Sequence, residues 1–107
     1  FFDNQGFYKY VDRCRAAGIS VPSIPGLKPL STPKQVRLLP ESFSIDIPFE
    51  LTSEISAHEN DRQAVYQIVQ EWAAAQCKDL LDHGVPGVHF YTMGKSANII
   101  GILRECF

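Results

Sequence analysis

Two loops of this sequence carry the side chains best suited to binding a ligand. The first loop ends at Gln35, a neutral amide, and the second runs from Tyr91 to Ser96 and also holds Met93 and Lys95. An amide donates and accepts hydrogen bonds at once. An aromatic ring beside an apolar side chain can pack on a flat ring, and an amine can pair with a carboxylate or phosphate.

Each of these residues also has a structural interpretation. Gln35 lies three residues after Thr32, which is the spacing of a capping box, and Pro33 suits the first position of a helix. The capping box and a ligand contact can coexist at Gln35. Tyr91 can be a core residue at the end of a strand, and Lys95 can be a solvated loop charge.

The same order of elements leads to both loops. A helical segment ends at Gly18 or Gly84, and a glycine there favours the left-handed conformation that closes a helix. Short apolar runs then predict buried strands at 21–24 and 88–91. Helix, turn, strand and loop is the repeating unit of parallel α/β folds, whose ligand sites lie in the loops after the strands.

Apolar spacing predicts two longer helices, over 4–17 and over about 59–83. The buried stripe of the first comprises Phe7, Tyr10, Val11 and Cys14. The stripe of the second comprises Val65, Ile68, Val69, Trp72, Ala73, Cys77, Leu80 and Leu81.

Three shorter helices complete the prediction. One begins at Pro33 and ends before Pro40, since a proline disfavours helical geometry in the residue before it. A second begins at Pro48. The last is capped by Ser96 and carries Ile99, Ile100 and Leu103. Phe1-Phe2 resembles the end of a further strand.

The histidines and cysteines do not form a recognisable catalytic or metal-binding motif. We interpret His89 as a core histidine, and His58 and His83 as surface residues at helix ends. The three cysteines are widely spaced, so neither a disulfide framework nor a metal site follows. Cys14 and Cys77 are interpreted as buried thiols.

The composition is that of one globular domain. The chain has 107 residues, of which 45% are hydrophobic and 21% charged, and its formal net charge is −2. This charge does not favour nucleic acid or an anionic membrane as a partner. The sequence shows neither a membrane span nor a signal peptide, so we expect a cytoplasmic protein.

Too few strands are present to complete a parallel sheet with both faces covered. The chain also opens on Phe1-Phe2-Asp3 without an initiator methionine. We therefore interpret it as a piece of a larger protein that does not fold independently. We expect the isolated chain to self-associate and to bury Phe1, Phe2 and the 65–81 stripe against a second copy.

An ordered set of short motifs resembles methylenetetrahydrofolate reductase. The match is to the C-terminal third of the catalytic barrel of that family, so residues 1–107 would be the C-terminal part of a single domain. The motifs are Phe1-Phe2-Asp3, Asp12-Arg13-Cys14, Gly18-Ile19, Pro25-Gly26, Pro29, Lys34-Gln35, Gly84-Val85 and His89-Phe90-Tyr91-Thr92.

The resemblance implies an α/β fold made of the last two to three βα units of a (β/α)8 TIM barrel. It also implies a reaction that uses FAD and NAD(P)H. A nicotinamide cofactor reduces FAD, which then converts methylenetetrahydrofolate to methyltetrahydrofolate. The chain would supply part of the folate and nicotinamide subsite but neither the catalytic acid nor the flavin-binding loops, so we expect it to be inactive alone and to retain no FAD.

The resemblance also implies roles for single residues. Gln35 occupies the position of a glutamine that reaches the folate, and Tyr91, Met93 and Lys95 lie at the mouth of the barrel. Leu39 aligns with a phenylalanine that stacks on ligand in some bacterial members. The alternative hypothesis is a small α/β interaction module without a catalytic role.

Overall fold

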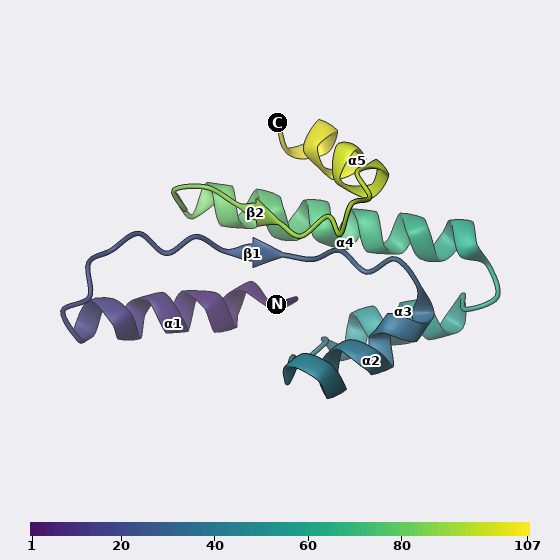
Figure 1. Cartoon of the computed structure of the whole chain (residues 1–107), viewed down its shortest axis with the longest axis horizontal. Helices are drawn as coiled ribbons and strands as arrows, with labels where there is room; N and C mark the ends of the chain where they lie inside the picture. The colour runs from purple at the N-terminus through teal and green to yellow at the C-terminus, as the bar shows by residue number, and fades with distance from the viewer.

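Five helices and two short strands make up the computed structural model, which describes residues 1–107. In chain order they are α1 (Asn4–Ala16), β1 (Gly26–Leu27), α2 (Pro33–Phe43), α3 (Phe49–Ala57), α4 (Arg62–Asp82), β2 (His89–Phe90) and α5 (Ala97–Cys106). The molecule measures 48 × 30 × 24 Å, and α1, β1 and α4 run along its long axis (Figure 1). None of the helices combines the length and hydropathy needed to cross a membrane.

The strands β1 and β2 pair in parallel and bring the two predicted loops together. Gly26 lies opposite His89, and Leu27 lies opposite Phe90. Side chains alternate between the two faces of a strand. Leu27 and Phe90 pack into a cluster with α4, so His89 and Tyr91 lie on the opposite face. One face of this small sheet is therefore covered, and the other carries the second loop's aromatic residue.

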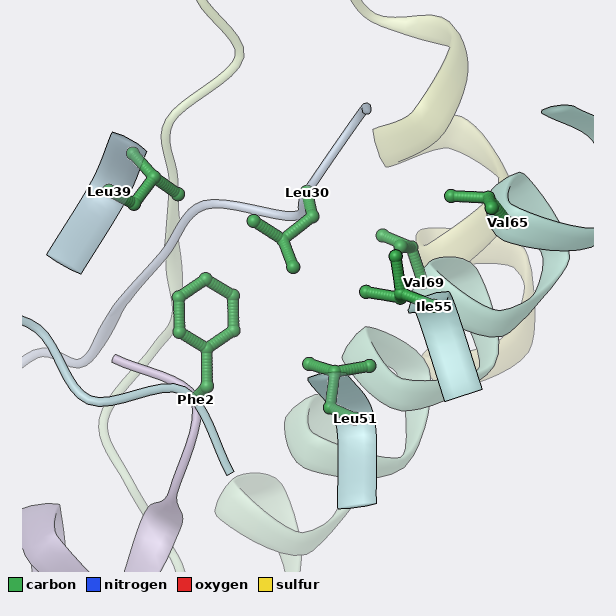
Figure 2. Close-up of a cluster of buried hydrophobic side chains, with 7 residues drawn as sticks. All are labelled: Phe2, Leu30, Leu39, Leu51, Ile55, Val65 and Val69. Carbon is green, nitrogen blue, oxygen red and sulfur yellow. The ribbon is translucent and has the colours of Figure 1, made fainter. Parts of the chain in front are cut away.

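Helix α4 connects the two hydrophobic clusters of the molecule. The first cluster joins it to α2, α3 and the first residues of the chain, and consists of Phe2, Leu30, Leu39, Leu51, Ile55, Val65 and Val69 (Figure 2). The second joins it to β1 and α5, and consists of Leu27, Ala73, Ala74, Cys77, Leu80 and Ile102. Full burial of one such large side chain contributes about 1.5–3 kcal/mol.

The first two residues are held by side chains of α4. Gln76 Nε2 donates to the Phe1 carbonyl at 3.1 Å, and Trp72 Nε1 donates to the Phe2 carbonyl at 3.2 Å. These residues lie outside both strands. The strand end predicted at Phe1-Phe2 is therefore wrong for this chain, because side-chain amide and indole groups satisfy the carbonyls that a neighbouring strand would otherwise bind.

The strand predicted at 21–24 is also wrong, because β1 begins only at Gly26. Val21 and Ile24 are 63% and 61% exposed. Pairing with β2 starts at the Pro25 carbonyl, which accepts from the His89 N–H at 2.9 Å. The apolar pattern of 21–24 lacks a partner strand within this chain. The strand predicted at 88–91 is confirmed in position, although only His89 and Phe90 are paired.

The two longer helices are confirmed, with small shifts. Asp3 caps α1 by accepting from the Gln5 N–H at 3.0 Å, and Asp61 caps α4 by accepting from two backbone N–H groups at 3.1 Å. Gly18 and Gly84 follow α1 and α4 with φ of 83° and 78°, so both predicted helix stops are confirmed.

Some predicted stripe residues lie on the wrong face. Tyr10 is 60% exposed, whereas Asn4 is buried and Tyr8 packs toward the second cluster. In α5 the buried residues are Ile99 and Ile102, while Ile100 and Leu103 are exposed. The face that a short helix buries depends on its neighbours, which its own pattern does not define.

Helix α2 continues through Pro40 and ends at Phe43, so the predicted stop before Pro40 is wrong. A proline inside a helix lacks one backbone hydrogen bond. Leu39 is 7% exposed and belongs to the first cluster, so its burial supports the helix at this point. Helix α3 begins after Pro48, as predicted.

Candidate functional site

A polar cavity of about 300 Å³ lies between the loops that follow β1 and β2. Gln35, Tyr91, Met93 and Lys95 all line it, and Lys28 adds a second amine. The two strands are parallel neighbours, so their C-terminal loops open on the same edge of the sheet. The structure thus brings together four of the five residues that the sequence singled out.

An apolar cavity of about 370 Å³ adjoins the polar cavity, and Lys28, Tyr91 and Met93 line both. Leu39, the fifth candidate, reaches the apolar cavity from α2, although most of its side chain is buried in the first cluster. Gly26 and four apolar residues complete its wall, the latter being Phe1, Phe2, Phe43 and Ile45. Tyr91 and Met93 therefore stand between a polar space and an apolar one.

The position of the Tyr91 ring depends on two residues of the sheet. The His89 imidazole meets it edge to face, with ring centroids 4.6 Å apart. On the adjacent strand, a Cβ atom at Gly26 would lie 2.7 Å from Tyr91 Cε2. The ring can therefore lie across β1 only because residue 26 is a glycine. His89 is exposed, so its predicted place in the core is wrong.

The second loop is a tight turn over Thr92–Lys95. Met93 and Gly94 have φ of 51° and 79°, and the Lys95 N–H donates to the Thr92 carbonyl at 2.9 Å. Two successive residues with positive φ are typical of a type I′ turn. Glycine adopts this conformation easily, but methionine does so at a cost. The turn leaves Met93 74% exposed beside both cavities.

Gln35 combines a structural contact with a free donor group. Its Oε1 accepts from the Ser31 N–H at 2.6 Å, and its NH2 group has no acceptor within the protein. The Thr32 side chain makes no capping hydrogen bond. The predicted capping box is therefore replaced by a contact one residue further back, which fixes the side chain at the wall of the polar cavity.

Comparison with known protein families identifies the chain. The family profile described as methylenetetrahydrofolate reductase matches residues 1–106. The chain belongs to the methylenetetrahydrofolate reductase family. The resemblance seen in the ordered motifs is thereby confirmed.

Curated relatives from three kingdoms carry the same family name. The chain is 34% identical over 105 residues to methylenetetrahydrofolate reductase (NADH) 1 of Arabidopsis thaliana, an alignment that covers 98% of this chain and 18% of the relative. It is 31% identical over 106 residues to the probable NADPH enzyme of Caenorhabditis elegans, covering 98% and 16%. Against 5,10-methylenetetrahydrofolate reductase of Escherichia coli K12, identity is 30% over 96 residues, covering 90% and 32%.

The chain therefore spans about a third or less of the length of these methylenetetrahydrofolate reductases. Its alignment with the plant relative includes nearly every residue described above. The relatives' names include both NADH and NADPH, so membership of the methylenetetrahydrofolate reductase family does not assign one nicotinamide cofactor to this chain.

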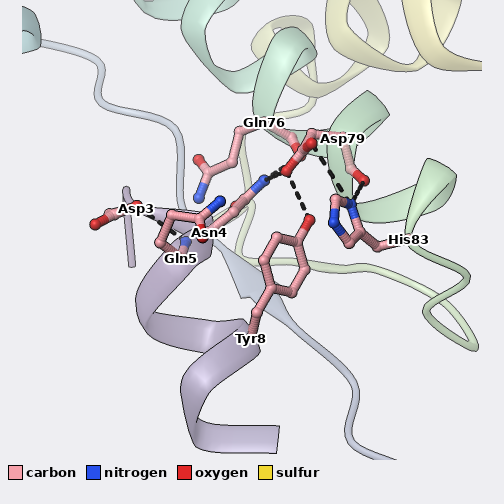
Figure 3. Close-up of polar contacts among 7 residues, drawn as sticks. All are labelled: Asp3, Asn4, Gln5, Tyr8, Gln76, Asp79 and His83. Carbon is pink, nitrogen blue, oxygen red and sulfur yellow. Dashed lines mark hydrogen bonds and ion pairs between the residues drawn. The ribbon is translucent and has the colours of Figure 1, made fainter. Parts of the chain in front are cut away.

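A second polar cluster was not predicted from the sequence. Asp79 Oδ2 accepts from the Tyr8 hydroxyl at 2.6 Å and from Asn4 Nδ2 at 2.8 Å (Figure 3). Asn4 Nδ2 also donates to the Gln76 carbonyl at 2.9 Å. The His83 ring stacks on Tyr8 with centroids 4.0 Å apart. This cluster fastens α1 to the C-terminal half of α4.

The cluster changes the protonation of two of its members. Burial, followed by the hydrogen bond to Asp79, raises the pKa of the Tyr8 hydroxyl above its ordinary value. The hydrogen bond from Tyr8, followed by that from Asn4, lowers the pKa of the Asp79 carboxyl. At neutral pH the pair is therefore a phenol that donates to a carboxylate, which is among the stronger hydrogen bonds in proteins.

No local pattern in the sequence points to this cluster. Asn4 and Tyr8 are one helical turn apart, which places them on one face of α1, but nothing in α1 indicates the partner on α4. The two loops were easier to predict, because parallel strands bring the loops at their ends together whatever the intervening sequence.

Proposed function

We propose that this chain is the C-terminal part of the catalytic barrel of an FAD-dependent methylenetetrahydrofolate reductase. In this proposal it forms one wall of the subsite that folate and the nicotinamide cofactor use in turn. The whole enzyme would convert 5,10-methylenetetrahydrofolate to 5-methyltetrahydrofolate with NADH or NADPH in the cytoplasm. The family membership supports this proposal.

One observation carries the assignment of the subsite. Gln35 from the first loop and Tyr91, Met93 and Lys95 from the second line a single cavity at the C-terminal edge of the strands. The free NH2 group of Gln35 can donate to a carbonyl of the pterin. The Tyr91 ring and the Met93 thioether can pack on its flat surface, and Lys95 can pair with the glutamate carboxylate of folate.

The residues of this chain fit a flat ring system but not a whole FAD. The apolar cavity is lined by aromatic and aliphatic side chains, with Lys28 as its only charged residue. A dinucleotide needs several further donors for its diphosphate and ribose groups. We therefore assign FAD to other parts of the full-length enzyme.

Gln35→Glu in the full-length enzyme tests the proposal. A carboxylate can still accept from the Ser31 N–H, but it replaces the free NH2 donor with a charged acceptor. We expect the reduction of methylenetetrahydrofolate to slow by roughly tenfold or more, as for a lost polar contact of 1–3 kcal/mol. Flavin reduction by the nicotinamide cofactor should change less, because that ligand presents a different hydrogen-bond pattern.

Rapid-mixing kinetics measures the two half-reactions separately, and Gln35→Met provides the matched control. Methionine removes the Ser31 contact as well, so this variant should lose about 1 kcal/mol of stability, whereas Gln35→Glu should not. Equal slowing of both half-reactions by Gln35→Glu, together with a lower melting temperature, would assign Gln35 a purely structural role.

A further inference from the structure

Two free cysteines, one on α4 and one on α5, lie together in the second hydrophobic cluster. Cys77 has no exposed surface, and Cys106 packs against the same cluster from the last turn of α5. Cys106 Sγ donates to the Ala74 carbonyl at 3.4 Å. Ala74 precedes Cys77 by three residues, so the two share one face of α4, and the Cys106 thiol points at that face.

The two helices approach closely along this contact. A Cβ atom at Gly101 would lie 2.5 Å from Gln70 Oε1, so α5 lies directly against α4 five residues before Cys106. Burial, followed by the charge and hydrogen bond of the Cys106 thiol, raises the pKa of Cys77 to about 12. Cys106 Sγ lies 3.4 Å from the carbonyl of Ala74, one helical turn before Cys77, so the two thiols lie close together, and Cys106 is the partly exposed one that a soluble oxidant reaches first.

We propose that Cys77 and Cys106 form a redox modification site, at which hydrogen peroxide converts the two thiols into a disulfide between α4 and α5. The Cys106 thiolate attacks peroxide, which breaks the O–O bond, forms a sulfenic acid and releases hydroxide. The Cys77 thiol then attacks the Cys106 sulfur, and its proton passes to the departing hydroxide, which leaves as water. The first hydroxide takes up the proton that Cys106 lost, so two thiols and one peroxide give one disulfide and two waters.

The disulfide would link the candidate site to helix α4. It closes the segment 78–105, which contains β2 and the turn over Thr92–Lys95. Asn98 and Ile99, in the first turns of α5, line the polar cavity. Oxidation would therefore hold that wall of the cavity against α4, and it would stabilise the fold because the unfolded chain loses freedom. This inference does not depend on the proposed reaction.

Peptide mapping of the full-length protein after treatment with hydrogen peroxide tests the site. Trypsin cleaves after Lys78 and Arg104, so the two cysteines fall on different peptides. We expect the peptide ending at Lys78 to become linked to the one beginning at Glu105, within single molecules on a non-reducing gel. The melting temperature should rise by several degrees and return to its starting value with dithiothreitol.

Three variants complete the test. Cys106→Ala should abolish the link and the rise in melting temperature, and Cys77→Ala should do the same if it folds. Cys14→Ala is the control and should change neither. If Cys77 and Cys106 remain unlinked while Cys106 accumulates as sulfinic acid, or if links form only between molecules, the proposal is wrong.

Discussion

Gly26 is the position at which one added methyl group should disturb the candidate site. Because a Cβ atom there would lie 2.7 Å from the Tyr91 ring, which is 52% exposed, we expect Gly26→Ala to displace the ring and to destabilise the protein by roughly 0.5–1.5 kcal/mol, the cost of a side chain forced off its rotamer. In a Tyr91→Ala background most of that cost should disappear. Urea unfolding of the two single variants and the double variant measures this coupling.

Gly87→Ala is the matched control for this cycle. A Cβ atom at residue 87 would meet no atom within 4 Å, so this substitution should cost little in either background. If Gly26→Ala is equally costly with and without the Tyr91 ring, the glycine is required by the backbone and not by the ring.

Asp79 should make the stability of the protein depend on acid pH. Its pKa is lowered in the folded state, first by the Tyr8 hydrogen bond, so ionised Asp79 stabilises the fold above the ordinary aspartate pKa of about 3.9. That contribution is lost as the pH falls through the lower, folded-state pKa. The carboxyl side chain is 46% exposed, so its contribution should be about 1 kcal/mol or less.

Unfolding of Asp79→Asn between pH 7 and pH 2 checks this expectation. The difference in unfolding free energy between the wild type and the variant should be largest near pH 7 and shrink towards pH 2. Asp12→Asn, at an exposed aspartate of α1, is the matched control. A difference for Asp79→Asn that stays constant with pH would mean that the carboxylate charge has no part in the cluster.

At the residue level, the positions of the candidate residues could be predicted from the loops in which they lie. Gln35, Tyr91, Met93 and Lys95 all follow the two strands and line one cavity, while their role in ligand binding stays a prediction. The contacts of Asn4 could not be predicted, because Asp79 lies 75 residues further along the chain. The role of Gly26 was equally hidden, since it depends on the neighbouring strand.

The turn between β2 and α5 is the element whose backbone most restricts its side chains. Met93 has a φ of 51°, a region that β-branched residues adopt only with strain. We expect Met93→Val to destabilise the protein by about 1 kcal/mol more than Met93→Leu, which keeps an unbranched Cβ. Urea unfolding of both variants measures the difference, and equal stabilities would show that the turn can change its conformation.

Helices and strands differed in how well their positions could be predicted. The starts and stops of α1 and α4 depend on local groups, such as the Asp3 and Asp61 caps and the glycines that follow. Strand pairing depends on a partner that is distant in the sequence. The apolar run at 21–24 therefore suggested a strand that has no partner here, whereas the actual strand β1 was missed.

The whole molecule leaves several large apolar side chains in water. Phe43 and Phe49 are 65% and 79% exposed, and exposed apolar groups favour association. We expect the isolated chain to self-associate, but not through the surfaces that the sequence suggested. Phe2 and most of the 65–81 stripe are buried within one copy, so the contacts must use other residues.

Sedimentation of the isolated chain over a range of concentrations tests this expectation. Replacing both Phe43 and Phe49 by glutamine should weaken the association without loss of stability, because neither side chain is buried. The same change at Tyr10, another exposed aromatic on α1, serves as the control. A wild-type chain that stays monomeric at high concentration would contradict the prediction.

Because α1 packs against α4, two segments that the ribosome makes at different times must meet before their contacts can form. Asn4 and Asp79 are separated by 75 residues. At a synthesis rate of about 5–20 residues per second, Asp79 is added roughly 4–15 seconds after Asn4. Throughout that delay Phe2, Asn4 and Tyr8 have no α4 to contact. The contacts that hold α1 to α4 therefore form only late in the synthesis of this segment, after the chain between the two helices is complete.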